Sequence, residues 1–231
     1  MRLDIKICGL KTPSAVDAAL QGGATHVGFI FFPRSPRNVD AATAGALRQA
    51  VLGRSKAVAV TVDASDSELD AIVAAMRPDL LQLHGAESPE RVVAVRRRFG
   101  LPVMKALPVR EAADLAAVAA FEGVADRLLL DAKPPPGAAL PGGNGLPFDW
   151  RLLQRLDNGL DYMLSGGIDE ANVDAALSLA APTGIDVSSG VESAPGVKDP
   201  ARIEALFRAV RAALDDRSRS PAQEVGHEQA G

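Results

Sequence analysis

The sequence contains one cysteine, Cys8, among its 231 residues. A single cysteine cannot form an intramolecular disulfide, and it cannot supply the several thiolates of a cysteine-based zinc site. Histidine is also scarce, because His26, His84 and His227 are the only three. A metal site built from several cysteines or histidines is therefore disfavoured.

Long apolar runs and an excess of positive charge are absent as well. The N-terminus, MRLDIKICGL, is charged early and lacks the about 7 to 15 apolar residues of a signal-peptide core. No run approaches the roughly 20 residues of a membrane span. The net charge of −4 is spread over both signs, whereas nucleic acids and anionic membranes require a concentrated basic face. We expect a soluble, cytoplasmic protein with no nucleic-acid and no membrane partner.

Aromatic residues make up only 4% of the chain, although 47% of it is hydrophobic. The chain can therefore bury a large core made mainly of Ala, Val and Leu. Its length exceeds the commonest domain size, but α/β barrels of about 200 to 250 residues routinely form one domain. A single domain is therefore allowed.

Short β-branched or leucine-rich runs recur along the chain, and a helical pattern follows each. Two of these helices have clear start signals, Thr12-Pro13 and Ser88-Pro89, in which a capping residue precedes a proline. The strands are predicted at Asp4–Cys8, His26–Phe31, Lys56–Val62, Leu80–His84, Pro102–Leu107, Arg127–Asp131, Tyr162–Leu164 and Ile185–Val187. Short connections through helices predict a parallel sheet, and eight strands can close.

We predict a (β/α)8 TIM barrel over residues 1–216. An open doubly wound sheet is the alternative, but it would normally show GxGxxG after the first strand, where this chain has Cys8-Gly9-Leu10-Lys11. A last amphipathic helix is predicted from Pro200 to about Asp215. From Arg217 the apolar periodicity stops, so residues 217–231 are predicted to be a disordered tail.

The stretch from Asp161 to Glu192 contains two strand ends in small residues, Ser165-Gly166-Gly167 and Ser188-Ser189-Gly190. Glycine lets backbone N–H groups approach an anion, and loops after the seventh and eighth strands of such barrels are a common phosphate site. Glycines that only shorten the loops are the simpler explanation. Two such turns in tandem favour a site for a phosphorylated small molecule.

Two residues at strand ends are candidates for acid–base chemistry. Cys8 ends the first strand and shares a face with Lys6, whose charge would stabilise a thiolate. Asp131 ends the sixth strand after three leucines, where partial desolvation would favour the protonated form that a general acid needs. A small buried thiol and a helix-capping carboxylate are the structural alternatives.

Other polar side chains follow the remaining strands. Gln82 and His84 share a face of the fourth strand and are candidates to orient a substrate. Asp186 lies in the eighth strand, where it could accept a hydrogen bond from a sugar hydroxyl or simply cap. The loop after the second strand presents Arg34 and Arg37, one of which could bind a planar carboxylate through two hydrogen bonds. A solvated turn is the alternative for this loop.

Several motifs together resemble one family. They are KICGL, GFIFFPRSPR, LLQLHG, LLLDA followed by GG-x-G-x-x-FDW, SGGI and DVSSGVE, and they occur in order from Lys6 to Glu192. In this combination the chain resembles phosphoribosylanthranilate isomerase. One departure is Asn144, in the loop after the sixth strand, where the resemblance leads us to expect threonine.

The resemblance implies an Amadori rearrangement in tryptophan biosynthesis. It converts N-(5-phosphoribosyl)anthranilate into 1-(2-carboxyphenylamino)-1-deoxyribulose 5-phosphate without a cofactor. Asp131 matches the family's general acid, Cys8 its general base, and Arg37 the residue that binds the anthranilate carboxylate. The backbone at Gly166, Gly167, Ser189 and Gly190 would hold the phosphate, while Gln82, His84 and Asp186 would orient the substrate.

Two other functions remain open at this stage. Another sugar-phosphate isomerase or epimerase would share the phosphate site, but an epimerase of this type would be expected to need several histidines for a metal. A barrel that binds a phosphorylated ligand without turnover is the second. The sequence leaves the oligomeric state open between a monomer and a homodimer.

Overall fold

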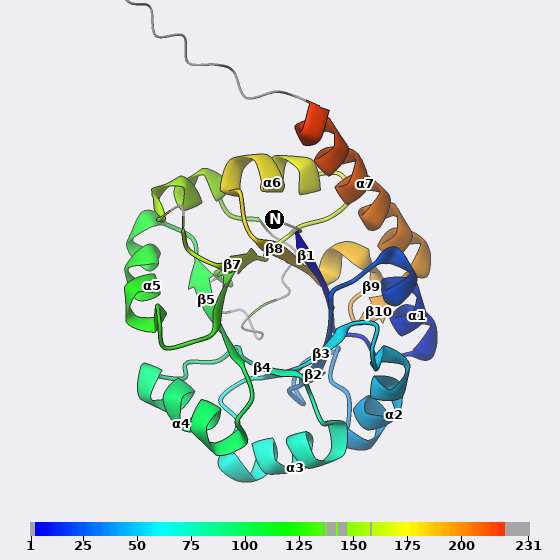
Figure 1. Cartoon of the computed structure of the whole chain (residues 1–231), viewed down its shortest axis with the longest axis vertical. Helices are drawn as coiled ribbons and strands as arrows, with labels where there is room; N and C mark the ends of the chain where they lie inside the picture. Colours follow the sequence, from blue (N-terminus) through cyan, green and yellow to red (C-terminus); the bar gives the residue numbers. More distant parts are fainter. Residues whose placement is uncertain (1–2, 136, 138–141, 143–146, 158, 220–231) are drawn as a thin grey trace, which may run out of the picture.

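Eight parallel strands form a closed barrel in chain order, and helices surround it (Figure 1). This computed structural model describes residues 3–135, 137, 142, 147–157 and 159–219. The strands are β1 (Asp4–Cys8), β2 (His26–Phe31), β3 (Lys56–Thr61), β4 (Leu80–Leu83), β5 (Val103–Val109), β6 (Arg127–Ala132), β7 (Tyr162–Leu164) and β8 (Gly184–Val187). The predicted (β/α)8 barrel is confirmed.

The helices begin where capping residues satisfy their first backbone N–H groups. Thr12 Oγ1 accepts a hydrogen bond from Ala15 N, and Ser88 Oγ accepts one from Arg91 N, with a proline following each cap. The α-helices are α1 (Pro13–Gly22), α2 (Ala41–Val51), α3 (Asp66–Met76), α4 (Pro89–Phe99), α5 (Ala116–Phe121), α6 (Val173–Ala180) and α7 (Pro200–Arg219). The 3₁₀ helices are η1 (Ala112–Leu115), η2 (Trp150–Arg155) and η3 (Ser189–Val191).

Two local differences from the predicted elements follow β7 and β8. Helix α6 begins at Val173 instead of near Asp169, because the Asp169 side chain accepts hydrogen bonds from Ala171 N and Asn172 N and so forms a turn first. After β8, strands β9 (Glu192–Ala194) and β10 (Val197–Lys198) form an antiparallel hairpin that the strand pattern did not predict.

Helix α7 continues past the predicted end near Asp215 and includes Arg217. Arg217 Nη2 donates to Asp174 O at 2.8 Å and to Ser178 Oγ at 2.6 Å, which ties the last turn of α7 to α6. The predicted boundary at residue 217 is therefore corrected to the end of α7. Residues 220–231 of the predicted tail lie outside the described residues. Over the described part of the chain, no helix is both long and apolar enough to cross a membrane.

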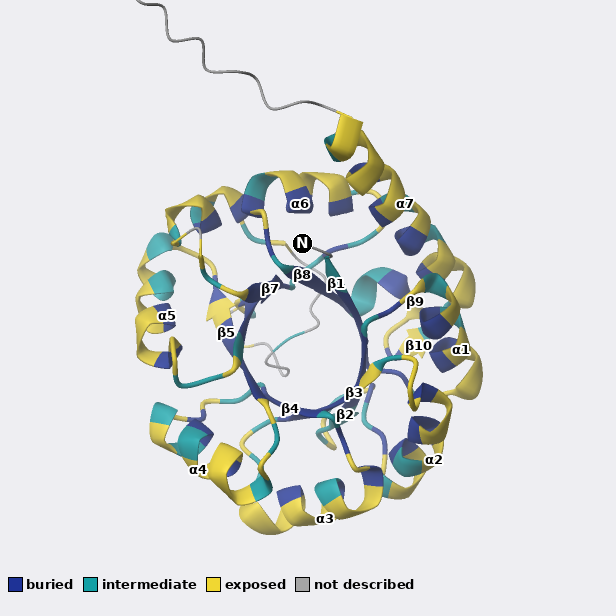
Figure 2. Cartoon of the chain, viewed as in Figure 1, coloured by how far each residue is buried: buried dark blue, intermediate teal, exposed yellow. Residues whose placement is uncertain are grey.

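Side-chain alternation along the strands divides the core into two layers. One set points into the barrel and packs there: Cys8, Val58, Val60, Leu80, Met104, Ala106, Leu129 and Met163. The alternate residues, such as Ile7, Leu81 and Leu130, point outward and pack under the helices. Figure 2 shows this arrangement as a buried ring of strands inside helices that are exposed on their outer faces.

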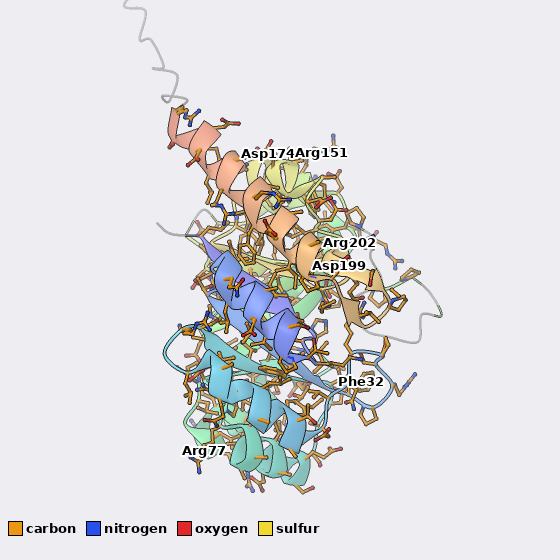
Figure 3. All side chains as sticks on the ribbon, turned by 90° about the vertical axis from the view of Figure 1, so that its right-hand side faces the viewer. Phe32, Arg77, Arg151, Asp174, Asp199 and Arg202 are labelled. Carbon is orange, nitrogen blue, oxygen red and sulfur yellow. The ribbon has the colours of Figure 1, made fainter. Side chains whose placement is uncertain are left out.

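The two ends of the barrel differ in chemistry. In the side view of Figure 3, Phe32, which follows β2, lies on the right and Arg77, which follows α3, lies on the left, at opposite ends of the barrel axis. At the Arg77 end, Arg48 Nη2 donates to Asp79 Oδ1 at 2.9 Å, and Asp79 Oδ2 accepts from Ala57 N at 2.7 Å. This partly exposed ion pair joins α2 to the start of β4 and β3, so it has a structural role.

The first and last helices pack against each other where the barrel closes. Strand β1 pairs with β8, and a Cβ added at Gly22 of α1 would lie 2.1 Å from Cδ2 of the buried Phe207 in α7. The Phe207 ring therefore occupies the space that any larger residue at position 22 would need.

We predict that Gly22→Ala lowers the free energy of unfolding by about 1–3 kcal/mol, because the added methyl group overpacks this contact. Thermal unfolding followed by circular dichroism measures the change. The control is Gly159→Ala, since a Cβ at Gly159 has no described atom within 4 Å. An equal Tm for the two variants would contradict the assigned packing role of Gly22.

Candidate active site

A pocket opens at the C-terminal ends of the barrel strands. It brings together residues of β1, β2, β3, β6 and β8 with residues from the loops after β2, β3, β4, β6, β7 and β8. The lining residues include Cys8, Ile30, Phe32, Arg37, Val60, His84, Asp131, Lys133, Ser165, Gly166, Gly167, Ile168, Asp186, Ser188 and Ser189. Active sites of parallel barrels occur at this end.

Cys8 points into the barrel at the end of β1, and a glycine on the neighbouring strand makes room for it. Cys8 pairs with Gly28 of β2. A Cβ at Gly28 would lie 2.9 Å from Cys8 Sγ and 3.1 Å from Lys6 Cε. Because Gly28 has no side chain, the Cys8 thiol and the hydrocarbon part of Lys6 can both pack against the backbone of β2 at this position.

Buried charges surround this thiol. Lys6 Nζ donates to Asp186 Oδ1 at 2.9 Å, and the Lys6 side chain is fully buried. Burial raises the pKa of Cys8 because it disfavours the thiolate; the positive charges of Lys6 and Lys198 oppose this rise, and Asp186 adds to it. Burial alone would lower the pKa of Lys6, but Asp186 raises it overall. Lys6 lowers the pKa of Cys8 as predicted, but burial raises this pKa by more.

Asp131 lies across the same pocket on β6, and His84 and Gln82 form a chain behind it. His84 Nε2 lies 3.2 Å from Asp131 Oδ2, and Gln82 Nε2 lies 2.9 Å from His84 Nδ1. Gln82 is fully buried, whereas His84 and Asp131 line the pocket. Gln82 therefore touches the site through His84.

Arg37 reaches the pocket from the loop after β2, and a glutamate holds it there. Arg37 Nε and Nη2 donate to the two carboxylate oxygens of Glu192 at 2.7 and 2.9 Å, and only 5% of Arg37 is exposed. Arg34, the other candidate in this loop, is exposed, and its guanidinium stacks 5.8 Å from the Phe32 ring centroid. Of the two arginines, Arg37 is the one that lines the pocket.

The two glycine-rich turns meet on the β7 and β8 side of the pocket. Gly166 and Gly167 have φ values of 92° and 66°, a left-handed backbone that side chains disfavour. Ser189 also lines the pocket. A Cβ at Gly190 would lie 2.0 Å from Ile168 O, so Gly190 allows the two turns to pack closely instead of forming the pocket wall.

Most of the predicted site residues therefore lie around one pocket, with Gln82 and Gly190 directly behind its wall. Sequence reasoning gave no role to Glu192 or Lys198, although Glu192 belongs to the DVSSGVE motif; a charged residue directly after a glycine turn was the available signal. Asn144 lies outside the described residues. Among those that are described, no group of three or more His, Cys, Asp or Glu side chains is placed to hold a metal ion.

A closed parallel barrel with a thiol, a carboxyl group and an arginine at its C-terminal mouth defines a (β/α)8-barrel enzyme. Comparison with known proteins narrows this class. The family model of N-(5'-phosphoribosyl)anthranilate (PRA) isomerase matches residues 5–209. A curated relative from Mesorhizobium japonicum, named N-(5'-phosphoribosyl)anthranilate isomerase, is 67% identical over 94% of this chain and 100% of its own. The chain belongs to the PRA isomerase family.

Solved structures agree with this assignment. Phosphoribosyl anthranilate isomerase from Thermus thermophilus is 33% identical, has a TM-score of 0.80, and is matched over 91% of this chain and 99% of its own. Another phosphoribosyl anthranilate isomerase, 26% identical with a TM-score of 0.78, is matched over 91% of this chain and 100% of its own. That structure is a complex with reduced 1-(o-carboxyphenylamino)-1-deoxyribulose 5-phosphate.

We predict that alkylation of Cys8 by iodoacetamide continues to rise above about pH 8.5, where an unperturbed thiol is half ionised. The sign follows from the raised pKa, because the thiolate fraction at neutral pH is then smaller than in free cysteine. Lys198→Met removes a nearby cation, so it should move the midpoint to still higher pH. Rates are measured by mass spectrometry.

Cys8→Ser is the control for this measurement, because the chain has no other cysteine and should take up no label. A midpoint below that of free cysteine would show that the lysines outweigh burial at this thiol.

Proposed function

We propose that this isomerase converts N-(5-phosphoribosyl)anthranilate into 1-(2-carboxyphenylamino)-1-deoxyribulose 5-phosphate, the Amadori rearrangement of tryptophan biosynthesis. Family membership supports the reaction. The roles of the two residues are supported by one observation: Cys8 and Asp131 line the same pocket, although they come from strands on different sides of the ring. An acid and a base acting on one small sugar must both reach it.

Asp131 is the general acid in this proposal. It gives a proton to the furanose ring oxygen, the bond from this oxygen to C1 breaks, and the anthranilate nitrogen supplies the electron pair that forms the iminium. The Gln82–His84 chain can serve either protonation state of Asp131. If the Gln82 amide nitrogen faces His84 Nδ1, then Nδ1 accepts a hydrogen bond and Nε2 carries the proton that it donates to the Asp131 carboxylate. If the amide oxygen faces Nδ1 instead, then Nδ1 carries the proton and Nε2 accepts a hydrogen bond from protonated Asp131.

The second of these orientations suits the acid. In the first, Gln82 Oε1 is buried and has no hydrogen-bond partner among the described residues. Turning the amide by half a rotation gives this oxygen the Nδ1–H of His84 as a donor. We propose that His84 and Gln82 orient the substrate through Asp131 in this way, with His84 also facing the pocket.

Cys8 is the general base. Its thiol first releases its own proton to water at the open mouth of the pocket. The thiolate then takes the proton from C2 of the iminium, and the electrons of the C–H bond neutralise the nitrogen to give an enolamine. This enolamine tautomerises to the amino ketone product. The iminium is the electron sink, so the step requires neither metal nor cofactor. Asp186 accepts a hydrogen bond from a sugar hydroxyl in this proposal; its position in the pocket lining, next to Lys6, supports the role.

The two anionic ends of the substrate anchor it on opposite sides of these groups. Arg37 binds the anthranilate carboxylate, and the backbone at Gly166, Gly167 and Ser189 receives the phosphate, with Gly190 supporting the turn. Binding energy from these ends holds C1 and C2 between acid and base. A cytoplasmic location and a monomeric or homodimeric state remain predictions for this chain.

We predict that Cys8→Ala and Asp131→Asn each lower kcat by at least about 10²-fold, the usual contribution of a positioned acid or base. Turnover is followed by the loss of anthranilate-type fluorescence when phosphoribosylanthranilate is mixed with the protein. Asp70→Asn is the control, because Asp70 is an exposed carboxylate on α3 that pairs with Arg98. Normal turnover by both site variants would disprove these roles, and phosphate binding without turnover by the wild type would identify a silent binding protein.

We predict that Arg37→Ala raises KM for phosphoribosylanthranilate and leaves the affinity for inorganic phosphate unchanged, because the carboxylate loses its bidentate partner. Steady-state kinetics with phosphate as a competitive inhibitor gives both values. Arg34→Ala, from the same loop but exposed, is the matched control and should keep the wild-type KM. Equal KM values for the two variants would rule out Arg37 as the carboxylate ligand.

A further inference from the structure

The mechanism leaves unexplained a buried cluster of charges behind the pocket, carried by the β9–β10 hairpin. Glu192 in β9 forms ion pairs with Arg37 and with Lys198 in β10. All three side chains are nearly inaccessible to solvent, with exposed fractions of 6% for Arg37, 3% for Glu192 and 2% for Lys198. Burying three charges costs free energy unless each is paired, and even paired buried charges seldom stabilise a fold more than apolar residues would. The cluster is therefore expected to have a role other than stabilising the fold.

On one side, Glu192 fixes Arg37 and the loop that carries it. Both carboxylate oxygens accept from the guanidinium, at 2.7 and 2.9 Å, which sets the plane of the Arg37 side chain. Gly196 N also donates to Glu192 Oε2 at 3.1 Å. A Cβ at Gly196 would lie 2.5 Å from Pro36 O, so the hairpin packs directly on the residue before Arg37.

On the other side, the same carboxylate holds Lys198, which supports the turn after β8. Lys198 Nζ donates to Ser188 O at 3.0 Å and to Ser188 Oγ at 3.2 Å. Ser188 Oγ in turn donates to Cys8 O at 3.1 Å. Lys198 therefore holds Ser188, which begins the turn after β8, and Ser188 links this turn to the end of β1.

We propose that Glu192 is a positioning residue that couples the two anchors of the substrate. Through Arg37 it orients the group that receives the anthranilate carboxylate, and through Lys198 and Ser188 it holds the turn that receives the phosphate. This inference rests on the proposed function, because both anchors are assigned there. It adds that one buried carboxylate, which does not line the pocket, serves both.

The test measures two small probes separately, anthranilate and inorganic phosphate. NMR titration gives their dissociation constants without requiring turnover. Glu192→Gln should raise both constants about tenfold or more, since the charge-assisted pairs to Arg37 and Lys198 are both lost. Arg37→Ala should raise the constant for anthranilate alone, and Lys198→Met the constant for phosphate alone.

Arg48→Met is the control for lost stability. It removes the ion pair between Arg48, which is buried, and the half-exposed Asp79 at the opposite end of the barrel, so it should lower Tm without changing either constant. If Glu192→Gln does not fold, Glu192→Asp replaces it, because aspartate keeps the charge but is too short to bridge both cations. It should raise both constants by a smaller factor.

Three outcomes overturn one claim or the other. Constants within about twofold of wild type for either probe, in a folded Glu192 variant, overturn the coupling, because about twofold is less than half a kcal/mol. A wild-type protein that turns over phosphoribosylanthranilate while the Glu192 variants bind normally overturns this inference alone. A wild-type protein that neither turns over this substrate nor binds anthranilate overturns the proposed function.

Discussion

The pairing of β1 with β8 is the contact on which the rest of the molecule depends. It closes the ring and sets Lys6 opposite Asp186, residues that are 180 positions apart in the chain. The same register places the turn after β8 beside the end of β1, where Ser188 Oγ reaches Cys8 O. Without closure, the thiol would end an edge strand. With it, the thiol faces a shared pocket whose opposite wall comes from β6.

Closure also creates an electrostatic problem, because charges enter a barrel interior with little water. Inside the barrel, Lys6 pairs with Asp186. Buried charges outside the barrel wall are paired as well, Lys198 and Arg37 with Glu192 and Lys105 with Glu87. In such surroundings an unpaired charge would be far more costly than a paired one. Burial raises the pKa of the Cys8 thiol despite two nearby lysines, so the thiolate is disfavoured there. Each of these buried cations is therefore held against a carboxylate.

Much of the fold and part of the site could be predicted from the sequence. The period-two alternation of strand residues correctly predicted that Cys8, His84 and Asp131 face the barrel interior, because successive side chains of a strand point to opposite faces. Alternation does not give depth, so Gln82 and His84 looked equivalent although one is buried behind the other. Composition also could not separate Gly190 from Gly166, since close packing and anion binding both favour glycine. The link from Lys198 to Ser188 depends on a hairpin whose strands are too short to show a pattern.

The raised pKa of Cys8 is at first sight unsuited to a base, but the proposed reaction gives it a reason. The substrate carries a phosphate and a carboxylate, so a thiolate already present in the pocket would repel it. A neutral thiol avoids this cost during binding. Ring opening then places a cationic iminium next to Cys8, and a cation within a few ångströms in a dry site strongly favours an anion beside it. In this order of events the intermediate itself lowers the cost of forming its base, and the buried lysines need to supply only the remainder.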